Sequence, residues 1–190
     1  DNIKDIYNGN VFVDATRGIV HIGEIMELTL DMFEEVMRKG PVAQEPGINI
    51  KVTLMDCKLH EDAIHRGPSQ IYPAVREGIR EAMNHARPVL YEPVQTLLFE
   101  APQDYMGEIS KIISNKRGQL LDAQQEGDQV SIKGKLPVGE MFGLSNELRS
   151  ATGGRGTSSL IDQAFEKMPE ELQQKIITQI RSRKGLSENQ

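Results

Sequence analysis

Residues 58–71 hold the densest group of side chains in the chain that can exchange protons or bind a charged ligand. His60, Asp62, His65 and Arg66 all stand in this segment, within one short stretch. Histidine acts as an acid, a base or a metal ligand near neutral pH, and arginine pairs with carboxylates or phosphates. Loops placed between rigid elements commonly carry binding chemistry, so we expect the function of this chain to depend on these residues.

One interpretation of the segment is the zinc site of a metal-dependent hydrolase. His60-Glu61 and His65 are similar in type to the His-Glu-x-x-His motif, but the second histidine comes one residue too late. Five residues turn a helix by roughly 500°, which leaves the two rings about 140° apart and unable to share a metal ion. A loop could still bring His60, Asp62 and His65 together as three ligands, so a metal site remains an alternative.

Two regular elements flank the segment. Before it, apolar and polar residues alternate over 48–54, the period of a strand with one buried face. After it, an apolar stripe predicts a helix with Pro73 in its first turn and Pro88 beyond its end. The stripe consists of Val75, Ile79, Ala82 and Met83. The segment is therefore expected to be a strand-to-helix loop, and His21 and His85, which stand near helix ends, are expected to be structural.

The remaining sequence predicts two small domains of the α+β class. A strand at 11–13 and a helix ending at Gly40-Pro41 complete residues 1–92, and the pattern starts again at Glu92-Pro93. Strands are predicted at 94–100, 120–124, 130–136 and 158–164, and helices at 105–115 and 140–149. This βαββαβ order is that of a ferredoxin-like domain, with Gly118 as the stop of its first helix. A last helix follows Pro169 and is expected to pack back on the first domain.

The composition indicates an ordinary globular protein. The chain has 190 residues, of which 38% are hydrophobic and 26% charged, and its apolar runs are too short to span a membrane. We expect a cytoplasmic protein with no membrane partner. Cys57 is the only cysteine, which excludes an internal disulfide and a cysteine metal cage. The chain begins at Asp1 without a methionine, so we expect it to be a piece of a longer protein.

Charge and motifs exclude several functions. The net charge of −6 argues against general nucleic-acid binding, and the basic residues form small islands at 65–66, 116–117 and 181–184. The glycine run at 153–156 lacks the lysine and spacing of a phosphate-binding loop. The strand at 130–136 lacks the aromatic residues that stack RNA bases. We therefore expect no catalytic residue, cofactor or metal in this chain.

The segment from Asp62 to Gly67, preceded by Leu59-His60 and followed by Gln70-Ile71, resembles the diphthamide loop of the elongation factor 2 family. Members of this family are the translocation GTPases of archaea and eukaryotes. Further segments resemble the fifth domain and the C-terminal ending of the same family, at 115–118, 136–143, 148–154 and 183–186. The resemblance covers essentially the whole chain as the last quarter of a longer protein, and Pro68-Ser69 is similar to archaeal members.

The resemblance implies an architecture. Residues 1–92 would be part of the fourth domain, which is of the type of the second domain of ribosomal protein S5 and mimics the anticodon arm of tRNA. Residues 93–167 would be the ferredoxin-like fifth domain. Residues 168–190 would be the C-terminal helix and tail.

The resemblance also implies roles for residues 58–71. His65 would be the histidine converted to diphthamide, whose trimethylammonium group would extend a positive charge toward codon and anticodon. Arg66 would assist with phosphate contact, and Gly67 would let the backbone fold tightly. The further residues that would shape the loop for RNA and the ribosome are His60, Asp62, Ile64 and Gln70.

The partners implied are the ribosome with tRNA and mRNA at its decoding site, the diphthamide biosynthesis enzymes and ADP-ribosylating toxins. GTP and magnesium bind in the N-terminal part of family members, which this chain lacks, so the chain by itself is not expected to be an enzyme. A paralogous elongation-factor-like GTPase of ribosome maturation or splicing is the alternative within the same family.

Overall fold

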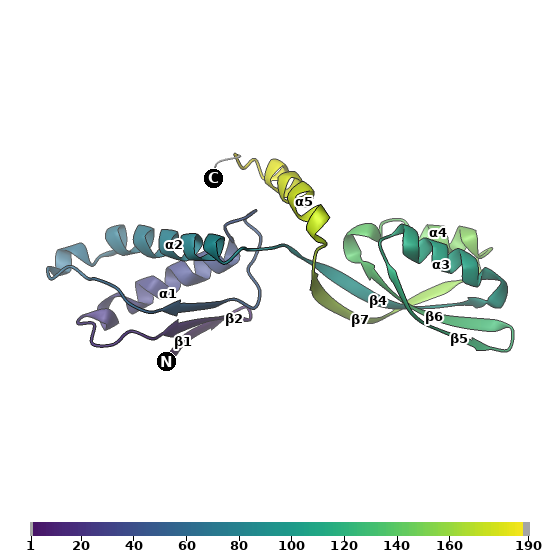
Figure 1. Ribbon diagram of the computed structural model, residues 1–190, viewed down its shortest axis with the longest axis horizontal. Helices are drawn as coiled ribbons and strands as arrows, with labels where there is room; N and C mark the ends of the chain where they lie inside the picture. The colour runs from purple at the N-terminus through teal and green to yellow at the C-terminus, as the bar shows by residue number, and fades with distance from the viewer. Residues whose placement is uncertain (1, 188–190) are drawn as a thin grey trace. The chain divides into compact units, whose positions relative to one another are not determined.

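The computed structural model describes residues 2–187 as two compact units (Figure 1). The first unit contains the residues up to Val89 together with those from Glu171 onward, and the second contains Leu90–Glu170. Each unit combines one sheet with helices, which confirms the predicted α+β class with two small domains. None of the helices within residues 2–187 is long and apolar enough to cross a membrane.

The first unit has a sheet of three strands, β1 (Asn2–Tyr7), β2 (Asn10–Asp14) and β3 (Lys51–Leu54), in that order. Strand β1 is antiparallel to β2, and β2 is parallel to β3. Asn8 and Gly9 join β1 to β2 with φ values of 47° and 77°, the geometry of a tight hairpin turn. The sequence interpretation missed β1. It also made β3 too long, because Asn49 has a φ of 55° and interrupts an extended chain.

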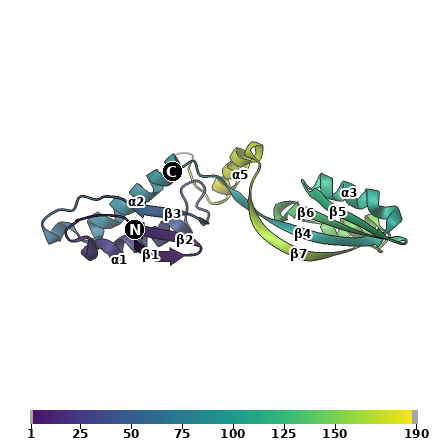
Figure 2. The same cartoon turned by 60° about the horizontal axis from the view of Figure 1, so that its bottom comes forward.

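Two helices pack on this sheet, α1 (Ile22–Arg38) between β2 and β3, and α2 (Pro68–His85) after the loop (Figure 2). Phe12 of β2 and Phe33 of α1 are almost fully buried, with ring centroids 5.5 Å apart. Val36, Met37 and Ile79 complete this core. Because α2 begins at Pro68, it starts earlier than predicted, and Pro73 lies inside the helix rather than in its first turn.

Helix α5 (Glu170–Arg183) meets the first unit through its C-terminal end. Arg181 donates to the carbonyl oxygen of Val42 at 2.8 Å, and the ammonium of Lys184 donates to that of Ala43 at 2.9 Å. Lys184 also pairs with Glu45 at 2.8 Å. The basic residues at 181–184 therefore include two side chains, Arg181 and Lys184, that bind the segment 42–45 of the same unit.

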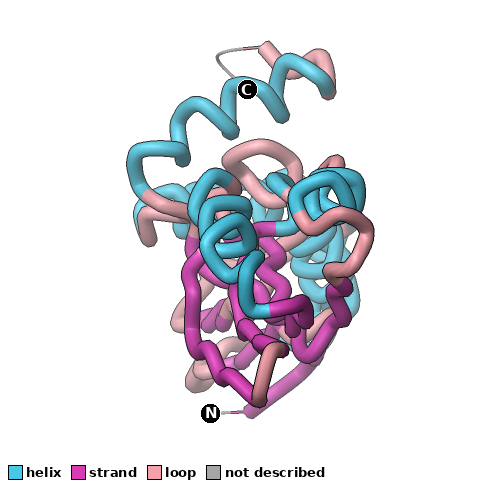
Figure 3. Tube along the Cα trace, turned by 90° about the vertical axis from the view of Figure 1, so that its right-hand side faces the viewer, coloured by secondary structure: helices cyan, strands magenta, loops and turns pink. Residues whose placement is uncertain are grey.

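The second unit has the predicted βαββαβ order. Its strands are β4 (Tyr91–Pro102), β5 (Gln119–Glu126), β6 (Gln129–Pro137) and β7 (Thr157–Lys167), and its helices are α3 (Met106–Asn115) and α4 (Leu144–Ala151). The sheet order is β5-β6-β4-β7, with every neighbouring pair antiparallel. Both helices lie on one face of the sheet (Figure 3). Helix α4 begins later than predicted, because residues 138–140 form a 3-10 turn.

The turn after α3 shows how closely the second unit is packed. Arg117, with a φ of 56°, is the left-handed residue that ends the helix, and Gly118 donates its N–H to the carbonyl oxygen of Ile113 at 2.8 Å. A Cβ on Gly118 would lie 2.6 Å from that oxygen and 2.9 Å from the carbonyl oxygen of Lys135. Glycine is thus needed at 118 for space, whereas the left-handed turn is made by the residue before it.

Candidate functional site

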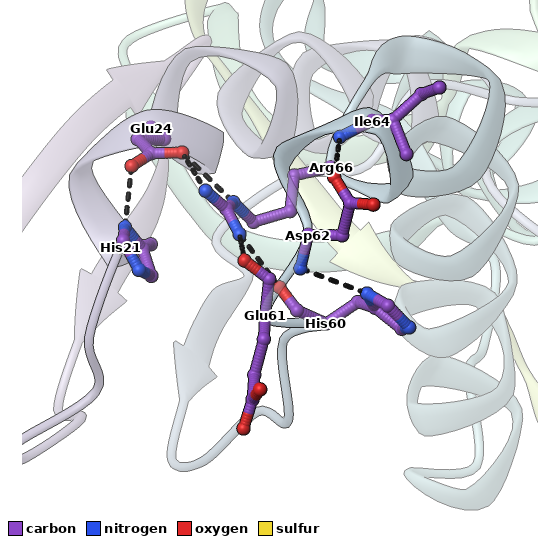
Figure 4. Close-up of polar contacts among 7 residues, drawn as sticks. All are labelled: His21, Glu24, His60, Glu61, Asp62, Ile64 and Arg66. Carbon is purple, nitrogen blue, oxygen red and sulfur yellow. Dashed lines mark hydrogen bonds and ion pairs between the residues drawn. The ribbon is translucent and has the colours of Figure 1, made fainter.

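The predicted loop runs from the end of β3 to the start of α2 and contains one 3-10 turn, Ala63–His65 (Figure 4). A carboxylate oxygen of Asp62 accepts the N–H of Ile64 at 3.1 Å, which caps this turn. The N–H of His65 donates to the carbonyl oxygen of Asp62 at 3.1 Å. Residues 60–65 are all exposed, so hydrogen bonds rather than an apolar core give this part of the loop its shape.

The two loop histidines contact each other. Their ring centroids are 4.4 Å apart, and the ring planes are inclined by 66°, so one ring edge faces the other ring. Nδ1 of His60 accepts the N–H of Asp62 at 3.0 Å, which places the proton of a neutral His60 ring on Nε2. His65 therefore lies in an exposed turn with the ring of His60 beside it.

Arg66 points into the first unit. Its side chain is 6% exposed. One terminal nitrogen donates to the carbonyl oxygens of His60 and Glu61, both at 2.7 Å. Nε and the other terminal nitrogen contact one carboxylate oxygen of Glu24, at 2.9 and 2.8 Å. This inward arrangement differs from the phosphate contact expected from the resemblance, because the guanidinium is engaged with protein oxygens on both sides.

Glu24 and His21 belong to the site and were missed as site residues in the sequence. Glu24 stands in the first turn of α1, and its second carboxylate oxygen lies 2.6 Å from Nδ1 of His21 (Figure 4). The hydrogen bonds from His21 and then from Arg66 hold the pKa of the Glu24 carboxyl below its ordinary value. The position of Glu24 at the start of a helix also favours its charged form. No local signal links Glu24 to Arg66, because the two are 42 residues apart.

The other predicted loop residues have different environments. Ile64 is 73% exposed. Gly67 has a φ of −83°, and a Cβ there would meet only the side chain of Gln70 at 3.7 Å, so the backbone conformation at this position does not itself require glycine. Gln70 is exposed in the first turn of α2 rather than in the loop, and it accepts a hydrogen bond from Ser69 at 2.7 Å.

The structure does not support the metal alternative. Within residues 2–187, no three histidine, cysteine, aspartate or glutamate side chains are grouped so that they could hold a metal ion. His60, Asp62 and His65 are among the side chains that this statement covers. A carboxylate oxygen of Asp62 instead caps the turn, and Nδ1 of His60 accepts a backbone N–H. Cys57 is half-buried, and burial raises the pKa of its thiol, so it has little thiolate character at neutral pH.

Comparison with known protein families gives two matches that follow the two units. Residues 3–87 match the family model of elongation factor G, domain IV, and residues 89–176 match that of the elongation factor G C-terminus. The chain belongs to the elongation factor G and elongation factor 2 family. The exposed histidine turn lies within the domain IV match.

Individual relatives are archaeal members of this family. The chain is 53% identical to elongation factor 2 of Nanoarchaeum equitans over 96% of its length, and 54% identical to that of Methanocaldococcus jannaschii over 95%. Elongation factor 2 of Pyrococcus furiosus is 50% identical over 98% of the chain. The matched part is 25% or 26% of each relative, so the chain spans about a quarter of their length.

Proposed function

We propose that this chain is the part of an archaeal translation elongation factor that enters the decoding site during translocation, and that His65 carries diphthamide there. The observation that carries the proposal is the exposed position of His65 on a capped turn, directly after two backbone carbonyls that Arg66 binds, within a unit that matches domain IV. Such a turn presents one imidazole to another molecule in a defined orientation.

The charges around the turn support a modification that adds a cation. Lys58 and Arg66 are the basic residues of 58–71, but Arg66 is already paired with Glu24, and Glu61 and Asp62 add two more carboxylates. The unmodified site therefore offers RNA no net positive charge. A trimethylammonium group on the His65 ring would supply one on the exposed turn of the loop, where it could reach phosphates and 2′-hydroxyls of tRNA and mRNA.

The proposal extends to the longer protein of which the relatives are examples. That protein would bind GTP and magnesium in a region outside this chain and act on the ribosome in the cytoplasm. The diphthamide biosynthesis enzymes and ADP-ribosylating toxins would reach His65 directly, because the side chain is exposed in a turn free of buried residues. The chain itself would position His65 and contact tRNA and mRNA, and it would not hydrolyse GTP.

The test uses the full-length protein from its native host with His65→Ala in a single-turnover translocation assay on archaeal ribosomes. We expect movement of tRNA and mRNA to slow by about tenfold, since one anchoring contact of about 1.4 kcal/mol corresponds to that factor. Ribosome-stimulated GTP hydrolysis should stay within about twofold of the wild-type rate, because the change lies outside the GTPase region.

His85→Ala is the matched control, because His85 is an exposed histidine at the other end of α2 whose Nδ1 lies 2.9 Å from the carbonyl oxygen of Glu81 in its own helix. Translocation by this variant should match the wild type. Equal slowing by both variants, or no slowing by His65→Ala, would contradict a role of His65 at the decoding site.

A further inference from the structure

Glu24 of α1 is linked through Arg66 to the loop that presents His65. Arg66 links the carbonyl oxygens of His60 and Glu61 to the Glu24 carboxylate, and all four described contacts are 2.9 Å or shorter. Figure 4 shows the guanidinium between the two groups, with the loop backbone on one side and Glu24 on the other. The start of α1 is in this way connected to the loop that precedes α2.

Arginine is suited to this link, whereas lysine is not. One terminal nitrogen of Arg66 has two hydrogens, one for each carbonyl, while Nε and the other terminal nitrogen face the carboxylate. With its side chain only 6% exposed, the guanidinium needs a counter-charge to remain inside. Removal of the Glu24 carboxylate would therefore favour an outward rotation of Arg66, which would release both carbonyls of the loop.

Glu24 is itself firmly placed. It immediately precedes Ile25, which is 4% exposed, and the buried Phe33 lies further along the same helix. His21, which precedes the helix with a φ of 66°, holds the free oxygen of the carboxylate through Nδ1. The first turn of α1 can therefore act as a rigid support for a loop whose residues 60–65 are all exposed.

We propose that Glu24 is a positioning residue for the loop and, through Arg66, for the modification of His65. The second half of this statement rests on the proposed function, and the first half does not. A modifying enzyme must bring one ring carbon of His65 to its reacting group, and it binds a preformed turn more tightly than a disordered one. Loss of Glu24 therefore lowers the yield of modified His65 without changing His65 or its immediate neighbours.

Two measurements on three variants test this inference. Glu24→Ala removes the carboxylate, Glu24→Gln keeps an oxygen that can accept from Arg66, and Glu27→Ala is a control at an exposed glutamate of the same helix. Amide hydrogen exchange by NMR reports the order of the loop at the N–H groups of His65 and Arg66, which bond within the turn. Mass spectrometry of the full-length protein from its native host reports the fraction of His65 that is modified.

We expect exchange at His65 and Arg66 to accelerate at least tenfold in Glu24→Ala, less in Glu24→Gln and not in Glu27→Ala, with unchanged exchange at Phe33 in the core. The modified fraction should fall at least fivefold in Glu24→Ala and partly recover in Glu24→Gln. Unchanged exchange in Glu24→Ala would overturn the positioning role. A wild-type protein without added mass on His65 would instead overturn the proposed function, and the exchange data would still decide the role of Glu24.

Discussion

Each unit of the protein holds a loop with a buried cation, and the two loops differ in what else supports them. In the first unit, Arg66 binds two loop carbonyls and the carboxylate of Glu24. In the second, the ammonium of Lys116 donates to the carbonyl oxygens of Glu140 and Phe142, at 3.2 and 3.3 Å, and pairs with Glu147 at 2.9 Å. The side chains of Arg66 and Lys116 are 6% and 10% exposed.

The surroundings of the two cations are unlike. The loop bound by Lys116 leads directly into Leu144 and Leu148, both buried in the core of the second unit. The loop bound by Arg66 consists of exposed residues from 60 to 65. We infer that Lys116 contributes mainly to the stability of its unit, whereas Arg66 contributes mainly to the local order of the exposed loop that carries His65.

The largest effect is expected from Gly118→Ala, next to the Lys116 site. A Cβ at this position would lie 2.6 Å from the carbonyl oxygen of Ile113, so the backbone of α3 or β6 must shift. We expect the second unit to lose about 3 kcal/mol of unfolding free energy, the upper end for overpacked sites. Amide exchange of Ile132, at the centre of that unit, measures the loss.

The matched glycine in the first unit is Gly67, where the nearest atom to a new Cβ is 3.7 Å away and φ is −83°. Gly67→Ala should therefore change the stability of the first unit by no more than about 0.5 kcal/mol. Similar losses of unfolding free energy from Gly67→Ala and Gly118→Ala would show that the loop is packed as closely as the second unit. That result would contradict the difference drawn between the two loops.

Lys116→Met is expected to have the next largest effect. The methionine fills similar space but leaves two carbonyl oxygens and Glu147 without their donor, which destabilises the second unit by about 2 kcal/mol. Denaturant dependence of Ile132 exchange gives this value. An unchanged stability would mean that water replaces the ammonium without penalty, and the contrast with Arg66 would be lost.

Arg66→Met should have a smaller effect on stability and a larger one on local order. Glu24 is 50% exposed and the freed carbonyls belong to exposed residues, so solvent can satisfy them, and the first unit should lose less than about 1 kcal/mol. NMR of the 60–66 amides should show exchange at least tenfold faster. A loss of stability as large as that of Lys116→Met would contradict the division between the two cations.

The smallest effect concerns the protonation of Glu24. Because hydrogen bonds from His21 and Arg66 lower its pKa in the folded chain, its stabilising contribution is present above the ordinary glutamate pKa and is lost as the pH falls through the lowered value. An NMR titration of the Glu24 carboxyl carbon should therefore have its midpoint below the ordinary value. His21→Ala should move the midpoint upward, since the His21 hydrogen bond is the largest cause. A wild-type midpoint at the ordinary value would rule out this arrangement.

Much of the fold could be predicted because the relevant signals are local. The helical stripe of α2 and the stop of α3 before Gly118 each need only a few neighbouring residues to be recognised, and both are present. The Asn8-Gly9 pair was an equally local hairpin signal, and β1 could have been predicted from it. The strand itself has no period-two apolar pattern, because Ile3 and Ile6 are three residues apart, and both side chains are exposed.

The candidate site could be predicted only in part. The segment itself and the exposed His65 follow from residue types and from resemblance to a family. The inward direction of Arg66 could not be predicted, because its partner Glu24 lies on another element and the pairing depends on how α1 and the loop meet in space. Tertiary pairs of this kind leave no periodic pattern in the sequence.

The most direct test of the account is the mass of the peptide Leu59–Arg66, released by trypsin from the full-length protein purified from its native host. Fragmentation separates the two histidines, so that added mass can be assigned to His60 or His65. The account predicts the diphthamide mass on His65 and none on His60. An unmodified His65, or added mass on His60, would contradict the claim that the loop bound by Arg66 presents His65 for modification and for the decoding site.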